Sequence, residues 1–198
     1  MNKLSILIEK GDLLDKNKFY TYLKLFRLKE KETYAHSVRV SLYSTKLAEK
    51  LELPDDEIAS IWLAGLLHDL GKLTVPNDIL LGEKPLTKEE SALIKKHPID
   101  GVNYLKEFTS ERVYLGALEH HERLDGKGYP YGLKKISLAG RIIAITDTFD
   151  AMTSKRTYQK SLTFQEALIK MEDLVNQNFY DKELFNYFKE VIEDIIDK

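Results

Sequence analysis

The sequence predicts an all-α fold. Apolar residues recur at spacings of three and four along most of the 198 residues, whereas segments that alternate apolar and polar residues are scarce. Five prolines and ten glycines punctuate the chain without filling any stretch of it. At a mean length of about 11–12 residues per helix, we expect roughly seven to nine helices.

Apolar stripes predict the helices of the first half of the chain. Three such stripes have helical spacing: Phe19, Leu23 and Phe26; Val38, Leu42, Leu47 and Leu51; and Ile58, Ile61, Trp62 and Leu66. Pro54 and Asp55 form a start signal before the third stripe. The stripe that begins at Phe19 is more typical of a core than of a partner surface.

Capping residues predict the helices of the second half. Thr87 with Glu90 and Thr163 with Glu166 match the capping box, in which a hydroxyl and a carboxylate satisfy the first free backbone N–H groups. Asp181 is a candidate cap for the last helix. Both capping boxes precede segments of apolar periodicity, so we expect helices to begin there.

Proline and glycine predict two interruptions of the helical pattern. Pro98 follows His97, so we expect one helix to end or bend there. Residues 123–135 contain three glycines and Pro130 and form the one long loop signal in the chain.

Composition excludes several classes of protein. Lys and Arg number 30 and Asp and Glu number 32, giving a net charge of −2, which argues against binding of nucleic acid through bulk charge. The chain is 43% apolar and 31% charged, as is ordinary for a globular protein. There is no run of about 18 apolar residues and no pattern of a secretory signal at the N-terminus. We therefore expect a cytoplasmic protein without a membrane span.

The absence of cysteine restricts a metal site to histidine and carboxylate ligands. The five histidines are His36, His68, His97, His120 and His121. Two of these positions form adjacent pairs of candidate ligands, His68-Asp69 and His120-His121. Any one histidine taken alone is more often a satisfied core or surface residue than a ligand. It is the set as a whole that favours a metal centre.

Two carboxylates extend this set. Glu32 lies four residues before His36, so on a helix both side chains share one face, although Glu32 also fits a solvated charged face in residues 29–32. Asp147 follows the apolar run 142–145, where a buried carboxylate needs a partner because its burial alone is costly.

These residues stand in motifs that resemble the HD superfamily of metal-dependent phosphohydrolases, specifically its HD-GYP branch. The resemblance extends from about residue 32 to the C-terminal helix. In order along the chain the matching motifs are His36, His68-Asp69-Leu70-Gly71-Lys72, Val75-Pro76, His97-Pro98 with Gly101, His120-His121-Glu122-Arg123, Asp125-Gly126, Gly128-Tyr129-Pro130, Gly132-Leu133, Ala139-Gly140-Arg141-Ile142 and Asp147-Thr148-Phe149-Asp150-Ala151.

The resemblance implies an HD-type helical bundle around a buried His/Asp centre with two or three divalent metal ions, most often iron or manganese. By position, Asp69 would be the carboxylate that bridges two ions, and Glu32 matches a glutamate found in members that bind three. The implied metal ligands are Glu32, His36, His68, Asp69, His97, His120, His121 and Asp147. All five histidines are thereby assigned.

The resemblance also implies an enzyme, a phosphodiesterase that hydrolyses the bacterial second messenger cyclic di-GMP to the linear dinucleotide pGpG and/or GMP. Metal-activated hydroxide would attack phosphorus, with Asp69 and Lys72 as catalytic residues. Lys72 resembles the family lysine that stabilises charge on the phosphoryl oxygens, and its alternative interpretation is a surface lysine near a helix end.

Substrate contacts follow from two further motifs. Arg156 is the implied contact for phosphate or guanine, because its guanidinium can bind bidentately. The loop Gly128-Tyr129-Pro130 is a structural turn, a substrate contact or a docking surface for a diguanylate cyclase or another regulatory protein. The chain departs from the family pattern beside Arg156: Thr157 replaces a proline and Gln159 a basic residue.

Those departures leave two alternatives open. One is a phosphohydrolase that acts on another cyclic dinucleotide or on a nucleotide. The other is a nucleotide-sensing or docking protein with low turnover. In terms of domains, we expect an N-terminal helical lead-in over residues 1–30 and the HD-GYP phosphohydrolase domain over residues 31–198.

Overall fold

The computed structural model describes residues 2–82, 84–154 and 161–196, and within them every regular element is helical. Only an isolated β-bridge between Leu13 and Thr109 adds to the helices of this part of the chain. The elements are α1 (Lys3–Glu9), α2 (Lys16–Lys29), α3 (Lys31–Lys50), α4 (Asp55–Leu67), the 3-10 helix η1 (Leu70–Thr74), α5 (Asn77–Leu80), α6 (Lys88–Ile94), α7 (His97–Leu105), α8 (Glu111–Glu119), α9 (Leu138–Thr153), α10 (Phe164–Asn176) and α11 (Lys182–Ile196). The predicted all-α class is confirmed.

The number of helices exceeds the expected seven to nine, because the described residues form eleven α-helices. The estimate was wrong since it assumed helices of average length. The helices α1, α5 and α6 have 7, 4 and 7 residues, and α5 buries no side chain. Helices this short are set by neighbouring contacts and chain ends, not by an apolar period of their own.

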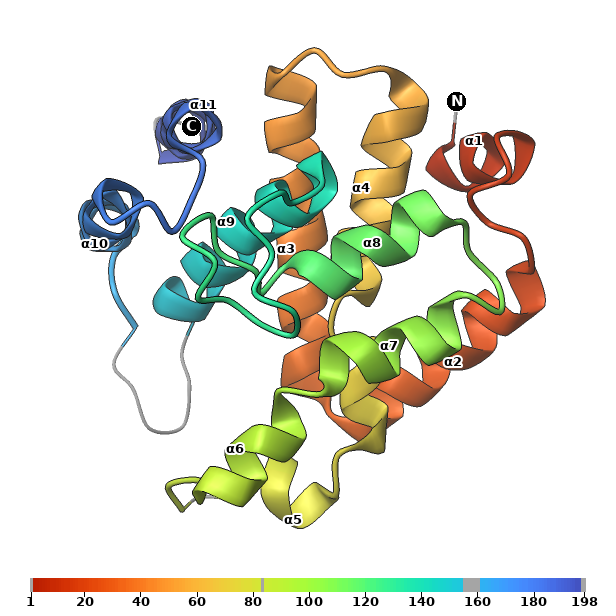
Figure 1. Ribbon diagram of the computed structural model, residues 1–198. Helices are drawn as coiled ribbons and strands as arrows, with labels where there is room; N and C mark the ends of the chain where they lie inside the picture. The colour runs from red at the N-terminus through yellow and green to blue at the C-terminus, as the bar shows by residue number, and fades with distance from the viewer. Residues whose placement is uncertain (1, 83, 155–160, 197–198) are drawn as a thin grey trace.

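Helices α3, α4 and α9 form the middle of the bundle. Helix α3 packs against α4 and α9, and α8 packs against both α4 and α9 (Figure 1). In Figure 1, α10 and α11 lie on one side of α3, and α1, α2 and α4 lie on the other. Each of α3, α4 and α9 contributes buried residues to both of the hydrophobic clusters that make up the core. The interior faces of these three helices are therefore fixed from both sides.

The predicted helix starts are confirmed. Thr87 and Glu90 form a capping box at α6, and Thr163 and Glu166 form another at α10. Asp181 Oδ1 accepts hydrogen bonds from the first free backbone N–H groups of α11, at 3.0 and 3.1 Å. Polar side chains thus begin three of the helices in the way that their spacing predicts.

Two details differ from the expectation. Pro98 neither ends nor bends a helix, because α6 ends at Ile94 and Pro98 lies in the first turn of α7. In a first turn the missing N–H of proline has no helical partner to lose, and its fixed φ suits the helix. Leu42, the second member of its apolar stripe, is 54% exposed on α3.

The N-terminal helices are part of the bundle. Phe19 and Phe26 of α2 are 2% and 1% exposed and belong to the core, as predicted for this stripe. Tyr22 stacks on Phe108, with ring centroids 5.3 Å apart. The division at residue 30 into lead-in and domain stays a prediction.

A buried carboxylate ties the start of the chain to two other helices. Asp12, between α1 and α2, is 2% exposed. Its oxygens accept hydrogen bonds from the hydroxyls of Ser60 in α4 and Ser110 before α8, at 2.7 and 2.5 Å, and from Arg112 at 3.0 Å. We refer to these four residues as the Asp12 network.

In the described residues no helix is long and apolar enough to cross a bilayer.

Candidate metal centre

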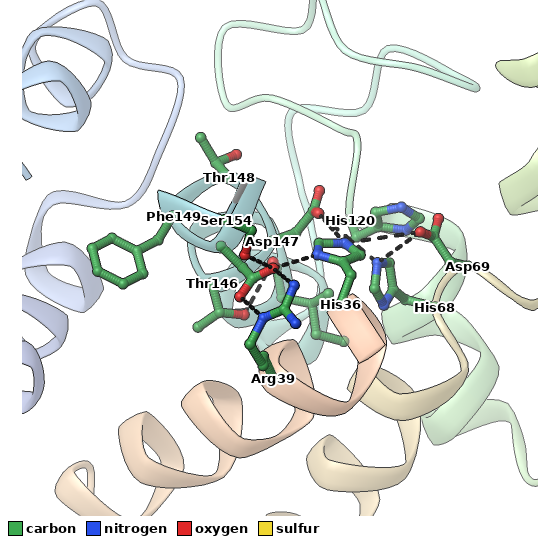
Figure 2. Close-up of polar contacts among 12 residues, drawn as sticks. His36, Arg39, His68, Asp69, His120, Thr146, Asp147, Thr148, Phe149 and Ser154 are labelled. Carbon is green, nitrogen blue, oxygen red and sulfur yellow. Dashed lines mark hydrogen bonds and ion pairs between the residues drawn. The ribbon is translucent and has the colours of Figure 1, made fainter. Parts of the chain in front are cut away.

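The first part of the site joins α3 to α9. His36, in the second turn of α3, is 8% exposed, and its Nε2 lies 3.0 Å from Asp147 Oδ1 of α9 (Figure 2). Its Nδ1 lies 2.7 Å from Asp150 Oδ2, one turn further along α9. Burial lowers the pKa of His36, but its hydrogen bonds to Asp147 and Asp150 outweigh burial and raise the pKa to about 9. In the absence of a cation, the His36 ring holds a proton between two carboxylates.

The second part lies where α4 ends. Buried apolar residues fill the last turns of α4, and they carry His68 and Asp69 into the interior, each 1% exposed. His68 Nδ1 donates to the carbonyl of Gly65 at 2.8 Å. Its Nε2 is buried and has no hydrogen-bond partner in the described residues. A buried, unpaired ring nitrogen is costly unless a cation or a proton occupies the position it faces.

The third part joins the start of α7 to the end of α8. The Nδ1 atoms of His97 and His120 donate to the carbonyls of Ile94 and Ala117, at 2.8 and 2.5 Å. Burial lowers the pKa of His97 to about 4 and the pKa of His120 well below its usual range, so both rings are neutral. Each Nε2 therefore presents a lone pair, although the two Nε2 atoms are only 3.2 Å apart. Two lone pairs at this distance repel each other, and a shared cation would relieve the repulsion.

Asp69 lies between these parts. Its Oδ1 is 3.2 Å from His97 Nε2, and its Oδ2 is 3.5 Å from His68 Nε2 and 3.9 Å from His36 Nε2. Burial would raise the pKa of Asp69, but the Lys72 ammonium and the imidazoles hold it well below its usual range. The ionised carboxylate thus faces His97 with one oxygen and His68 and His36 with the other, as a ligand shared by two cations would.

The donor atoms fit divalent metal ions. Three groups have ligand atoms that all lie within 4.8 Å of one another: His36, His68 and Asp147; His68, Asp69 and His120; and His97, His120 and His121. Neutral imidazole with carboxylate is a donor set that suits manganese, iron and zinc. Together with the unpaired Nε2 of His68, these groups show that the residues could hold divalent metals.

A second layer of contacts, which the sequence analysis did not identify, surrounds Asp150. This carboxylate is 1% exposed and accepts from Arg39 Nε at 2.7 Å, from Arg39 Nη2 at 3.0 Å and from Ser154 Oγ at 3.0 Å, in addition to His36. A carboxylate on the far nitrogen of a ligating histidine fixes the tautomer and the ring orientation. The signal in the sequence was the spacing: Asp150 follows Asp147 by three residues, as Arg39 follows His36.

Lys72 and Glu32 occupy different positions relative to the centre. Lys72, in η1, is half-buried, and its Nζ is 2.6 Å from Asp69 Oδ2, so it is not a free surface lysine. Glu32 is exposed in the first turn of α3 and belongs to none of the three ligand groups found among the described residues. The structure brings seven of the eight expected ligands together and leaves Glu32 at the margin.

A close approach of backbones sets the position of His97. A Cβ atom built on Gly71 of η1 would lie 1.9 Å from the His97 carbonyl oxygen and 2.5 Å from the Gly101 nitrogen. Only glycine lets η1 and α7 come this near. The contact holds His97 within reach of Asp69.

The loop after α8 is held by the carboxylate of Glu122 and by a close backbone contact at Gly128. The carboxylate of Glu122, 1% exposed, accepts from the backbone N–H groups of Tyr131 and Leu133 at 2.7 and 2.8 Å. A Cβ on Gly128 would lie 2.4 Å from the Arg123 nitrogen, so this glycine too marks a close approach. Gly128, Tyr129 and Pro130 are all partly buried against the end of α8, whereas Arg156 lies outside the described residues.

Comparisons with known proteins agree with this geometry. A match to the HD domain family covers residues 22–184. The chain is 41% identical over 176 residues to "Cyclic di-GMP phosphodiesterase PA4108" of Pseudomonas aeruginosa, a match that covers 86% of the chain and 42% of that protein. It is 37% identical over 178 residues to "Cyclic di-GMP phosphodiesterase" of Thermotoga maritima, covering 87% of the chain and 48% of that protein.

Among solved structures, the fold is similar to that of Bd1817, described as an HDG"Y"P protein from Bdellovibrio bacteriovorus. The TM-score is 0.65 at 28% sequence identity, over 81% of this chain and 52% of that one. The chain thus spans less than half the length of the two curated relatives and about half of this structure.

Proposed function

The chain belongs to the HD domain family, in its HD-GYP branch, and from that premise we propose that it is a metal-dependent phosphodiesterase that hydrolyses cyclic di-GMP to pGpG and/or GMP. The observation that carries the proposal is the position of Asp69, whose ionised carboxylate faces histidines from two ligand groups. Relatives named cyclic di-GMP phosphodiesterases support the choice of substrate.

The proposed ligands would hold two cations, iron or manganese, with Asp69 shared between them. His36, His68 and Asp147 would hold one cation, and His97, His120 and His121 the other. Glu32 is our proposed ligand for a third cation, because it lies one helical turn before His36. When bound, the cations supply Lewis acidity toward the phosphoryl oxygens and make water a stronger nucleophile.

Side chains and backbone carbonyls of the chain orient the groups that this reaction would use. Asp150 and three backbone carbonyls hold imidazole rings in the orientation that directs Nε2 inward. The Nζ of Lys72 lies beside Asp69 and would bring a positive charge to the site where the phosphate charge would develop. His68, Asp69, His97 and His120 are each at most 1% exposed, and this burial limits the access of bulk water to the proposed centre.

The substrate and its partners would be recognised around this centre. We propose Arg156 as a phosphate or guanine contact and Gly128, Tyr129 and Pro130 as the loop that borders the substrate. The same loop is our candidate docking surface for a diguanylate cyclase or another regulatory protein. The cytoplasmic location expected from the sequence stays a prediction.

The test is hydrolysis by purified protein that has been loaded anaerobically with Fe(II) or Mn(II). Cyclic di-GMP and other cyclic dinucleotides are compared by chromatography of the products and by elemental analysis of the protein. The double variant His68→Ala, Asp69→Ala should lose metal and activity, whereas Asp173→Ala, an exposed carboxylate on α10, should lose neither. Lys72→Met should retain its metal and lose about 10²–10³-fold in kcat.

Two outcomes would reject the assignment. Intact cyclic di-GMP in the presence of fully loaded protein, with turnover of another cyclic dinucleotide, would favour a different substrate, as the departures at Thr157 and Gln159 allow. Tight binding of the nucleotide without turnover would favour a sensing or docking protein.

A further inference from the structure

Four of the five imidazoles are oriented by a hydrogen bond on Nδ1. The acceptor is a carboxylate for His36 and a backbone carbonyl for His68, His97 and His120. Within the part of the chain that the structure describes, no hydrogen bond orients the ring of His121. Yet the His121 ring lies 4.0 Å from that of His120, centroid to centroid, and 5.1 Å from that of His97, in one ligand group. Something other than a hydrogen bond must hold it there.

His121 instead stacks on the aromatic ring of Tyr129, a contact that the other four histidines do not make in the described residues. The rings of His121 and Tyr129 are stacked, with centroids 4.5 Å apart and planes inclined by 26°. The backbone N–H of Tyr129 also donates to the carbonyl of His121 at 3.2 Å. Tyr129 therefore contacts both the backbone and one face of the ring, and a stack of this geometry limits rotation of the imidazole about its side-chain bonds.

Tyr129 is itself held on several sides. The Glu122 carboxylate anchors the following loop through the N–H groups of Tyr131 and Leu133. Gly128 brings the preceding backbone against residues 121–123. Lys95 Nζ lies over the Tyr129 ring, 5.4 Å from its centroid, in a cation–π contact. The Tyr129 ring is thus itself held in place by its neighbours, so its face can orient the ring of His121.

We propose that Tyr129 is a positioning residue for the metal centre: the face of its ring orients His121 toward His97 and His120, in place of a hydrogen bond on Nδ1. The inference rests on the proposed function in so far as these three histidines bind a cation. It gives the middle residue of the Gly-Tyr-Pro motif a role in positioning the ligand His121, in addition to the substrate and partner contacts proposed for the loop.

The test measures Mn(II) binding to chelator-treated protein by calorimetric titration. Tyr129→Ala should weaken the affinity at one cation position by about 10- to 100-fold, the usual effect of losing a group that orients a ligand. Tyr129→Phe keeps the aromatic face and should restore wild-type affinity. Tyr131→Ala is the matched control, because Tyr131 is in the same loop and 60% exposed, and it should bind as wild type does.

A second readout separates positioning from a general effect on stability. Thermal unfolding is recorded for each variant with chelator and with excess Mn(II). Loss of positioning should reduce the increase in Tm that Mn(II) produces, because that increase depends on affinity. A merely structural role would lower Tm equally in both conditions. If Tyr129→Ala does not fold, Tyr129→Leu, which keeps apolar bulk without a π face, takes its place.

The possible failures are distinct. Wild-type protein that binds no Mn(II) or Fe(II) would reject the proposed function, and the inference with it. Wild-type binding together with undiminished affinity in Tyr129→Ala would reject the inference alone. Equal losses in Tyr129→Phe and Tyr129→Ala would also reject it, because the hydroxyl and not the ring face would then matter.

Discussion

Replacing Gly71 by alanine should displace a proposed metal ligand, His97, without contacting its imidazole ring. The new Cβ would stand 1.9 Å from the His97 carbonyl oxygen, a backbone atom that cannot rotate away. Reaching even the shortest tolerable separation, 3.0 Å, requires η1 and α7 to move apart by about 1.1 Å. The first residue of α7 is His97, so the ligand moves with the helix.

The expected magnitude follows from that shift. His97 Nε2 lies 3.2 Å from both Asp69 Oδ1 and His120 Nε2, so a displacement of about 1 Å would break the arrangement of the ligand group. Misplacing a positioned group by about 1 Å can lower the rate by about 10²-fold. Overpacking at such a contact lowers the free energy of unfolding by about 1–3 kcal/mol. We expect Gly71→Ala to lose metal from the group that contains His97, and to lose activity accordingly.

The same contact supplies a matched control. A Cβ on Gly101, on the other side of the contact, would meet Gly71 at 3.3 and 3.7 Å, so a shift of a few tenths of an ångström accommodates it. In addition, alanine is favoured over glycine within a helix by roughly 0.5–1 kcal/mol. Gly101→Ala should therefore be close to neutral in stability, metal content and kcat. Elemental analysis, urea unfolding and the kcat of the loaded protein measure all three quantities for both variants.

Two results would refute this reasoning. If Gly71→Ala retains wild-type metal content and kcat, the close approach of η1 and α7 does not position His97. If Gly101→Ala is as damaging as Gly71→Ala, the loss comes from glycine content at the contact and not from the collision of Cβ with the carbonyl oxygen.

Three further predictions concern stability and metal affinity. Asp150→Asn should weaken Mn(II) binding by about 10–100-fold in calorimetric titration, because the amide cannot replace the carboxylate that orients His36; unchanged affinity would contradict this. In metal-free protein the pKa of His97 is about 4 and that of His36 about 9. The unfolding free energy should therefore decrease as the pH falls from 6.5 toward 4, because the unfolded chain binds a proton at His97 that the folded chain does not. It should also decrease as the pH rises from 6.5 toward 9, because the folded chain then loses the proton of His36. A flat profile of urea unfolding in chelator would be inconsistent with both shifts. Asp12→Ala should lower the unfolding free energy by about 1–3 kcal/mol, since it removes the acceptor of the Asp12 network, and should leave metal content unchanged; a loss of metal in a variant that remains folded would count against this separation.

The fold could be predicted where the local signal was strong. The start at Asp55 and the capping boxes at Thr87 and Thr163 rest on contacts within four residues, so sequence patterns detect them. The short helices, and Pro98 as the start of a helix rather than its end, could not be predicted in this way. They depend on packing between segments that are distant in the chain.

The candidate site divides in the same manner. The proposed ligands stood out because the chain has only five histidines and because these lie in motifs, and seven of the eight proposed ligands meet in one place. The contacts that orient them did not stand out. Asp150 reaches His36 across 114 positions, and the stack of Tyr129 on His121 is a matter of ring planes, which spacing does not encode.

Most of the proposed metal ligands lie at or beside the ends of helices: His68 caps the end of α4, His97 begins α7 and His120 caps the end of α8. Helix termini are the first parts of a fold to open, and these three belong to separate helices. A bound cation would link several helix ends and suppress their fraying. Part of its binding free energy would therefore appear as increased stability of the folded chain. We expect metal supply to set the lifetime of this protein against proteolysis as well as its activity.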